Sequence, residues 1–282
     1  MTTKILDGKA LAAKIKADLA QQAKNLSARP GLAVILVGDN PASRVYVNSK
    51  RKDCEECGFY SEEYTLPAES DPTQLLELIQ VLNGRADIDG ILVQLPLPPQ
   101  FDEKAVLLAI DPDKDVDGFH PMNVGRLMTG ESCFLPCTPA GVMELLAEGG
   151  VDPAGKHCVV LGRSNIVGKP QALLMLQKDA TVTICHSRTP DLAEECRRAD
   201  ILVCAVGKTG LVTPDMVKEG AVIVDVAMNR DENGKLCGDC CRDTYEKASC
   251  FTPVPGGVGP MTRAMLMKNT LRAAMLHGKG MR

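Results

Sequence analysis

Short, mostly apolar runs recur along the chain, and between them apolar residues repeat at the spacing of a helix. Each run leads into a polar or glycine-bearing turn; the runs are residues 32–37, 91–95, 157–161, 181–185, 201–206 and 221–226. Continuous apolar strands that alternate with helices are typical of parallel sheets covered on both faces. The pattern therefore predicts a doubly wound α/β fold.

Helix signals occupy the segments between these runs. Asn40 followed by Pro41 is typical of an N-cap and a first helical turn, and Gly58 is typical of a helix end. Together they predict a helix over Pro41–Cys57. Periodicity and capping predict further helices around residues 11–19, 72–82, 140–148 and 262–277.

A stretch that contains several prolines and glycines, between Asp111 and Pro139, interrupts this alternation. After it the pattern restarts with a helix, a strand and a glycine turn, and a length of 282 residues accommodates two domains. We therefore expect an N-terminal α/β domain formed by residues 1–137 and 263–282. Residues 138–262 are expected to form a second domain with a parallel sheet.

Composition excludes several functional classes. The apolar fraction is 45% and the charged fraction 24%, as in an ordinary globular protein. A net charge of −4 leaves no basic surface for nucleic acid. The apolar runs are too short to span a membrane, and the N-terminus has no signal-peptide pattern. We expect a cytoplasmic protein without nucleic-acid or membrane partners.

Twelve cysteines raise the question of a metal site or disulfides. Two pairs, Cys54/Cys57 and Cys237/Cys240, have the spacing of zinc ligands. However, Cys54 and Cys57 fall at the end of a predicted helix, and other cysteines fall in apolar runs, where a thiol acts as a small apolar group. We therefore expect neither a metal site nor, in a reducing cytosol, disulfides.

A glycine-bearing turn, residues 162–168, follows the apolar run 157–161 and precedes a helix. This order approximates the phosphate turn of a Rossmann-like domain, with Ser164 where the second glycine usually stands. Glycines allow the backbone to approach a pyrophosphate, and the first amides of the helix bind it. The turn predicts a dinucleotide site.

The end of the next strand indicates which dinucleotide binds. NAD sites usually place an acid there to hold the ribose hydroxyls. This chain has Ser187 and Arg188 instead, and no acid until Asp191. A carboxylate would repel a 2′-phosphate, whereas Ser187, Arg188 and Arg163 would bind it. The sequence favours NADP.

Polar groups of the N-terminal half form a second set of candidates. Tyr46 and Lys50 are four residues apart and share a helix face. Gln94 lies at the carboxyl end of an apolar run, where open α/β sheets bind ligands, and Asp117 lies near the domain junction. Near the C-terminus, residues 253–262 form a loop rich in proline and glycine. Residue types and spacings alone do not say what these groups act on.

Several longer motifs in the sequence resemble those of a known family. They are residues 37–43 with Tyr46, Val47 and Lys50, then residues 89–98, 114–119, 136–139, 162–170 and 253–262. In this order they cover essentially the whole chain. The sequence resembles the bifunctional methylenetetrahydrofolate dehydrogenase/methenyltetrahydrofolate cyclohydrolase, or FolD, family.

The resemblance implies an enzyme of one-carbon metabolism. NADP would take a hydride from 5,10-methylenetetrahydrofolate, and water would open the methenyl product to 10-formyltetrahydrofolate. By position, Lys50 would be the general base or proton relay and Gln94 would tune it. Tyr46 would pack on the aminobenzoyl group, and Asp117 would bind the pterin. Further substrate contacts are expected from Pro255, Gly256 and Gly257.

The resemblance also implies the cofactor contacts and the assembly. Arg163 and Ser187 match positions that hold the 2′-phosphate in NADP-using members. The full set of expected cofactor residues is Thr138, Gly162, Arg163, Ser164, Val167, Gly168, Ser187 and Arg188. The family resemblance implies a folate-binding catalytic domain and an NADP domain with the active site in a cleft between them. It also implies a homodimer.

Three alternatives remain at this point. A monofunctional dehydrogenase would have lost the hydrolytic step, against which the intact Tyr46, Lys50 and Gln94 argue. A short-chain dehydrogenase also has a Tyr-x3-Lys pair, but there the pair follows the glycine motif, whereas here it precedes it. A catalytically silent NADP sensor would have no need of Lys50 or Gln94.

One segment departs from the family pattern. Where many members have Asp-Val-Gly-Ile-Asn, this chain has Ala227 and Met228 at the third and fourth positions. The added methyl group of Ala227 is expected near the cofactor edge. We expect a modest change in nicotinamide placement and no change in the assignment.

Overall fold

The computed structural model describes residues 3–280. Contacts divide the chain into two compact units. The N-terminal unit comprises Ala13–Leu135 and the segment that begins at Arg263, and the C-terminal unit comprises Pro136–Thr262 and the segment that ends at Ala12. The divisions fall within α1 (Gly8–Lys24) and α9 (Val258–Leu276), so each of these helices belongs partly to each unit.

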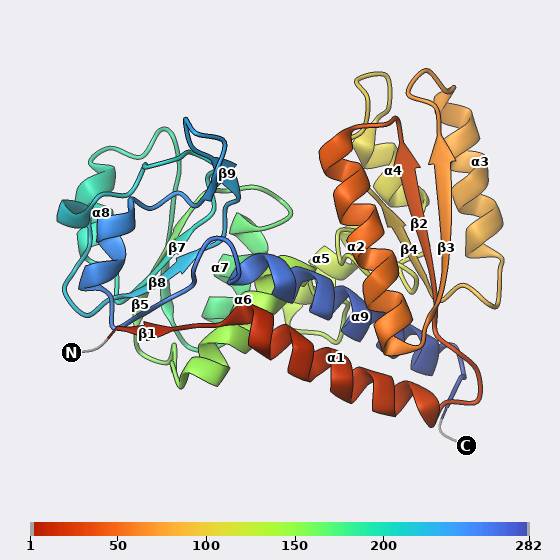
Figure 1. Cartoon of the computed structure of the whole chain (residues 1–282), viewed down its shortest axis with the longest axis horizontal. Helices are drawn as coiled ribbons and strands as arrows, with labels where there is room; N and C mark the ends of the chain where they lie inside the picture. The colour runs from red at the N-terminus through yellow and green to blue at the C-terminus, as the bar shows by residue number, and fades with distance from the viewer. Residues whose placement is uncertain (1–2, 281–282) are drawn as a thin grey trace. The chain divides into compact units, whose positions relative to one another are not determined.

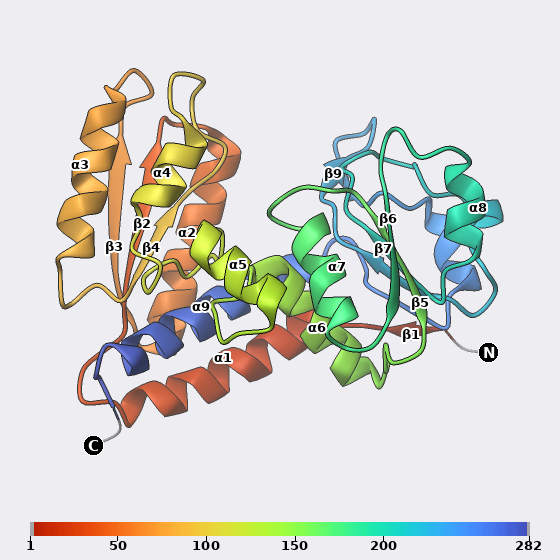
Figure 2. The ribbon, with the colours of Figure 1, turned by 180° about the vertical axis from the view of Figure 1, so that it is seen from behind.

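The N-terminal unit is built on a three-stranded parallel sheet in the order β3-β2-β4. Its strands are β2 (Gly31–Val37), β3 (Tyr60–Leu66) and β4 (Gly90–Val93), and its own helices are α2 (Pro41–Cys57), α3 (Pro72–Asn83), α4 (Glu103–Ala109) and α5 (Pro121–Thr129). All seven residues of β2 are buried. Helices α3 and α4 cover one face of the sheet and α2 covers the other (Figures 1 and 2).

The C-terminal unit contains a six-stranded sheet in the order β1-β11-β8-β7-β5-β6, with every neighbouring pair parallel. The strands are β1 (Lys4–Ile5), β5 (His157–Leu161), β6 (Thr181–Cys185), β7 (Ile201–Cys204), β8 (Val222–Asp225) and β11 (Cys250–Phe251). Around them lie α6 (Cys137–Gly149), α7 (Gly168–Leu176), α8 (Leu192–Arg197), the 3-10 helices η1 (Pro214–Met216) and η2 (Arg242–Lys247), and the hairpin of β9 (Asn229–Arg230) and β10 (Leu236–Cys237). The predicted α/β fold with parallel sheets is confirmed.

The strand order of this sheet creates a topological switch point. The chain passes from β5 to β6 on one side, then returns to β7 and β8 on the other side of β5. Connections that depart in opposite directions leave a crevice at the carboxyl ends of β5 and β7. The residues that follow these two strands therefore lie at the position where open α/β sheets bind ligands.

Most predicted elements are observed, but three predicted strands extend too far. Strand β8 spans Val222–Asp225 rather than residues 221–226. Strand β4 ends at Val93 rather than residue 95, because Pro96 and Pro98 have no N–H to continue a ladder. Strand β7 ends at Cys204 rather than residue 206, just before Gly207, which has a left-handed φ of 81°. Strand β3 and helices α4 and α5 lie outside the predicted set.

Within the described residues, no helix is long and apolar enough to cross a membrane. The same residues contain no group of three or more His, Cys, Asp or Glu side chains arranged to hold a metal ion. All twelve cysteines are free thiols, and ten of them are buried.

The buried thiols predict a loss of stability at alkaline pH. Burial raises the pKa of Cys54, Cys57, Cys158 and Cys196 to about 12. In the unfolded chain a thiol ionises near pH 8.5, so above that pH the unfolded state releases protons that the folded state retains. The free energy of unfolding should fall by about 1.4 kcal/mol per pH unit for each thiol, until the pH reaches its folded pKa.

Urea unfolding midpoints measured between about pH 9 and about pH 10.5 check this expectation. The Cys158→Ala variant serves as the matched comparison, because it removes one of the four thiols. Its free energy of unfolding should decline less steeply with pH than that of the parent protein. Identical slopes for the two proteins would contradict a buried, protonated Cys158.

Candidate functional site

Lys50 and Gln94 are brought into direct contact in the N-terminal unit. Lys50 lies in α2 and is half-buried, and its Nζ donates a hydrogen bond of 3.0 Å to Gln94 Oε1. Gln94 follows β4 directly, and its backbone N–H donates to Ile35 O of the neighbouring strand. Its side-chain Nε2 donates to Leu95 O at 2.7 Å, which turns Oε1 toward the lysine. The amide thus orients an amine at the carboxyl edge of the sheet.

Tyr46 lies one helical turn before Lys50 on α2 and is 40% exposed. Burial of the other part of the ring raises the pKa of its phenol, and the nearby Arg263 opposes that rise. Part of the Tyr46 side chain is thus accessible on the helix face that also carries Lys50. This placement suits stacking on a planar group.

A buried carboxylate fixes the helix that carries Lys50 and Tyr46. Asp53, 2% exposed, accepts a hydrogen bond of 2.6 Å from Lys16 Nζ of α1 and one of 2.9 Å from Arg263 of α9. Arg263 also donates to Ser49 O. Three helices therefore meet at one ion-pair network. The sequence analysis did not single out Asp53, since its partners are distant along the chain.

Asp117 lies just after a segment that pairs with β4, because Ile91 and Asp115 form a parallel bridge. The Asp117 side chain is half-buried. Asp115 is buried and accepts hydrogen bonds from the backbone of Phe119 and His120, and burial raises the pKa of its carboxyl. Asp115 is thus the carboxylate that holds the loop, and Asp117 is the more accessible of the two.

In the C-terminal unit, the predicted phosphate turn follows β5 as expected. A Cβ on Gly162, whose φ is 109°, would lie 2.3 Å from Ala205 O, and a Cβ on Gly168 would lie 2.2 Å from Gly162 O. Only glycine fits either position. Ser164 Oγ accepts hydrogen bonds from Val167 N and Gly168 N, at 3.2 and 3.3 Å. Close backbone approach and the two hydrogen bonds to Ser164 Oγ therefore hold the turn in a tight conformation.

The groups predicted to hold the 2′-phosphate lie at the end of β6. Gly162 N donates to Cys185 O, so the glycine turn adjoins the end of that strand. Ser187 and Arg188 follow Cys185, and both are exposed, as is Arg163 in the turn. The first acid after β6 in the chain, Asp191, caps α8 by accepting a hydrogen bond of 3.1 Å from Glu194 N. A phosphorylated ribose fits this set of donors better than a bare ribose does.

Other predicted contacts lie elsewhere in the C-terminal unit. Thr138 shares a hydrogen bond of 2.9 Å with Thr262, between α6 and α9, rather than lying in the glycine turn. In the proline- and glycine-rich loop, Gly257 N donates to Pro253 O at 2.7 Å. Gly256 accepts from Lys9 N, which ties the loop to the start of α1. Pro255 is exposed on this braced loop.

The segment that departs from the family pattern follows β8. The Met228 side chain is 42% exposed. Its Sδ atom lies 3.6 Å from the position that a Cβ atom on Gly259 would occupy. The Met228 side chain therefore lies near the first turn of α9. Asn229 is held by its own hydrogen bonds to Gly238 O and Asp239.

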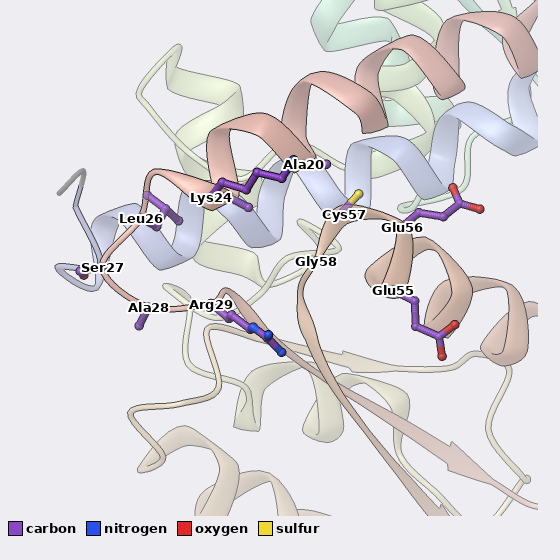
Figure 3. Close-up of a pocket in the computed structure, with 11 residues that line it drawn as sticks. Ala20, Lys24, Leu26, Ser27, Ala28, Arg29, Glu55, Glu56, Cys57 and Gly58 are labelled. Carbon is purple, nitrogen blue, oxygen red and sulfur yellow. The ribbon is translucent and has the colours of Figure 1, made fainter.

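A separate pocket of about 410 Å³ lies between the C-terminal ends of α1 and α2 (Figure 3). Its charged lining residues are Lys24, Arg29, Glu55 and Glu56. Figure 3 shows the carboxylates of Glu55 and Glu56 pointing in different directions. None of the predicted site residues lines this pocket, and we assign it no part in the chemistry.

Comparison with known proteins identifies the family. A model of the tetrahydrofolate dehydrogenase/cyclohydrolase catalytic domain matches residues 6–117, and a model of the NAD(P)-binding domain matches residues 136–278. The chain belongs to the tetrahydrofolate dehydrogenase/cyclohydrolase family. Tyr46, Lys50, Gln94 and Asp117 fall in the part matched by the catalytic domain of this family. The glycine turn and the end of β6 fall in its NAD(P)-binding domain.

Members of this family are similar over the full chain. The bifunctional protein FolD of Ruminiclostridium cellulolyticum is 58% identical over 280 residues, which are 98% of this chain and 99% of the relative. The solved structure of FolD from Campylobacter jejuni is 50% identical, with a TM-score of 0.96, and covers 98% of this chain and 99% of that chain. FolD from Trypanosoma brucei, solved with NADP cofactor and an inhibitor, is 41% identical, with a TM-score of 0.93 and the same coverage.

Proposed function

We propose that this chain is a bifunctional enzyme. It oxidises 5,10-methylenetetrahydrofolate with NADP to 5,10-methenyltetrahydrofolate, then hydrolyses that product to 10-formyltetrahydrofolate. The observation that carries the proposal is the 3.0 Å hydrogen bond between Lys50 Nζ and Gln94 Oε1, within the part matched by the family's catalytic domain. Full-length relatives described as bifunctional support both activities.

Lys50 acts as the base of the hydrolytic step. The methenyl carbon belongs to a cation, and a cation nearby favours the neutral form of an amine. Neutral Lys50 accepts a proton from the water whose oxygen bonds to that carbon. The carbon–N5 bond then breaks, N5 ends as N–H, and one proton is released overall. Gln94 holds the amine by accepting its N–H, so that the lone pair is directed toward the water.

The remaining N-terminal groups bind and orient the folate. Tyr46 packs its exposed face against the aminobenzoyl ring. Asp117 accepts paired hydrogen bonds from the amino and ring N–H groups of the pterin. Pro255, Gly256 and Gly257 supply further substrate contacts from the braced loop. Lys50 is therefore the titratable group to which we assign proton transfer at the reacting carbon.

NADP, when bound, accepts the hydride. Gly162, Val167 and Gly168 bring the backbone and the first amides of α7 to the pyrophosphate, and Ser164 and Thr138 add hydroxyl contacts. Arg163, Ser187 and Arg188 bind the 2′-phosphate. Asp191, the first acid after β6 in the chain, is engaged as the cap of α8.

A two-stage spectrophotometric assay tests the function. Purified protein is mixed with 5,10-methylenetetrahydrofolate and NADP, and the same cuvette then follows hydrolysis of added methenyltetrahydrofolate. We expect turnover in both stages. Hydride transfer without accelerated hydrolysis would reduce the assignment to a monofunctional dehydrogenase, and no reaction in folded protein would overturn it.

We also infer a homodimer. The family resemblance supports it, as does the position of β3 at the edge of its sheet, where it pairs with β2 alone among the described strands. An edge strand of seven residues leaves backbone groups available to a second chain. Free, mostly buried thiols support a reducing compartment, and we propose the cytoplasm.

A further inference from the structure

Two buried acids at the carboxyl edge of the C-terminal sheet have no part in the roles proposed so far. Asp225 is the last residue of β8, and Asp239 lies two residues beyond β10; neither side chain is exposed. A buried carboxylate is costly unless hydrogen bonds compensate for the lost water. The partners of these two acids therefore indicate what they hold in place.

Asp239 binds three consecutive backbone amides of the loop that follows β7. Its Oδ2 accepts from Val206 N at 2.7 Å and Gly207 N at 3.2 Å, and its Oδ1 accepts from Lys208 N at 2.7 Å. Asn229 Nδ2 donates to the same Oδ1 at 3.0 Å. Successive amides that converge on one anion form a concave nest, here filled by the protein's own carboxylate.

Asp225 in turn fixes the segment that carries Asp239. Its carboxylate accepts from Asp239 N and Cys240 N, both at 2.9 Å, and from the Tyr245 hydroxyl at 2.7 Å. A Cβ on Gly238 would lie 2.0 Å from Asp225 Oδ2, so this approach requires glycine. The two acids thus form a chain of contacts from β8 to the β7 loop.

The loop held by Asp239 lies at the topological switch point. Ala205 N donates to Leu161 O at 2.8 Å, and Ala205 O lies so close to Gly162 that a Cβ there would clash. Residues 206–208 therefore adjoin the phosphate turn across the crevice between β5 and β7. Val206 is 46% exposed on this loop and offers an apolar wall to a bound dinucleotide.

We propose that Asp239 is a positioning residue for hydride transfer, which it supports by fixing the loop of residues 206–208 against the bound dinucleotide. The inference rests on the proposed function and concerns only its redox step. A shift of about 1 Å in a reacting group is enough to cost about 100-fold in rate. The hydrolytic step relies on Lys50, so a loosened β7 loop should leave it unchanged.

The test compares the two activities of Asp239→Asn. This variant preserves the size of the side chain but replaces one acceptor oxygen with an N–H donor that faces other donors. We expect kcat of the dehydrogenase to fall about 10- to 100-fold, with methenyltetrahydrofolate hydrolysis within about twofold of the parent protein. Amides of residues 206–208 should exchange hydrogen faster. Parallel losses in both activities, or an unchanged dehydrogenase, would overturn the proposal.

Two further variants keep the test decisive. Cys250→Ala is the control, because it removes a buried thiol from the same sheet and leaves Asp225, Asp239 and the amides of residues 206–208 in place. Both of its activities should stay within about twofold of the parent. If Asp239→Asn does not fold, Asn229→Ala removes one hydrogen bond to Asp239. It should slow the dehydrogenase selectively, and equal effects on both activities would count against the role.

Failure of the proposed function would be visible separately. If the parent protein lacks either activity, the functional assignment fails before any variant is made. The hydrogen exchange of residues 206–208 in Asp239→Asn would then still decide whether Asp239 fixes the loop. Unchanged exchange would overturn that part of the inference.

Discussion

The Lys50→Met variant should lose hydrolysis of 5,10-methenyltetrahydrofolate by about 100-fold or more while it binds NADP within about threefold of the parent protein. Methionine keeps much of the aliphatic stem of lysine but removes the amine that donates to Gln94. Lys50 is the group to which we assign proton transfer at the reacting carbon, so its loss should stop the hydrolytic step. The cofactor groups lie in the other unit, so NADP affinity should be preserved.

Initial rates of methenyltetrahydrofolate loss, corrected for the reaction without enzyme, measure the first effect, and cofactor titration measures the second. Lys52→Met is the matched control, because Lys52 lies on the same helix and is exposed. It should hydrolyse at the parent rate. A Lys50→Met enzyme that hydrolyses at near the parent rate would remove Lys50 from the mechanism.

Replacing both Arg163 and Arg188 with alanine should weaken NADP binding by about 100-fold and NAD binding by about threefold or less. A charge-assisted hydrogen bond contributes about 1.5–3 kcal/mol, so each arginine accounts for at least about tenfold. NAD lacks the 2′-phosphate. Its binding should therefore lose only the weaker, longer-range attraction between the two arginines and the negative charge of its pyrophosphate.

Dissociation constants for the two cofactors, measured on the same double variant, give this ratio directly. Arg197→Ala serves as the control, because Arg197 is exposed on α8 and pairs with Glu194. It should leave both constants unchanged. Equal losses for NADP and NAD would exclude recognition of the 2′-phosphate by Arg163 and Arg188.

The regular elements were predictable where one physical signal dominated. Helix α2 is bounded as expected, because Asn40 accepts from Ser43 N at its start and Gly58 follows its end with a φ of 71°. Strand β3 gave no such signal: four of its seven residues, Ser61, Glu62, Glu63 and Thr65, are polar. An edge strand buries little, so its sequence need not be apolar.

The candidate site was predictable as residue types but not as contacts. Lys50 and Gln94 are separated by 44 positions, and their spacing carries no information about a hydrogen bond. The fold creates it by pairing β4 with β2 and packing α2 against β2. Their proposed roles came from the family resemblance rather than from spacing.

The contacts of Asp225 and Asp239 illustrate the same limit more sharply. An acid within the apolar run 221–226 was a visible signal, since such a position is buried in a parallel sheet. Its partners, however, come from residues 239, 240 and 245, in a segment with little periodicity. Only the folded chain reveals that these acids support the β7 loop.

The central claim is that one chain removes a hydride from the one-carbon bridge and then adds water to the same carbon. Mass spectrometry of the product formed from 5,10-methylenetetrahydrofolate and NADP in ¹⁸O-labelled water tests it most directly. The account predicts 10-formyltetrahydrofolate that carries one labelled oxygen and accumulates in step with NADPH, much faster than with the Lys50→Met variant. NADPH formation with labelled product appearing no faster than without enzyme would contradict it.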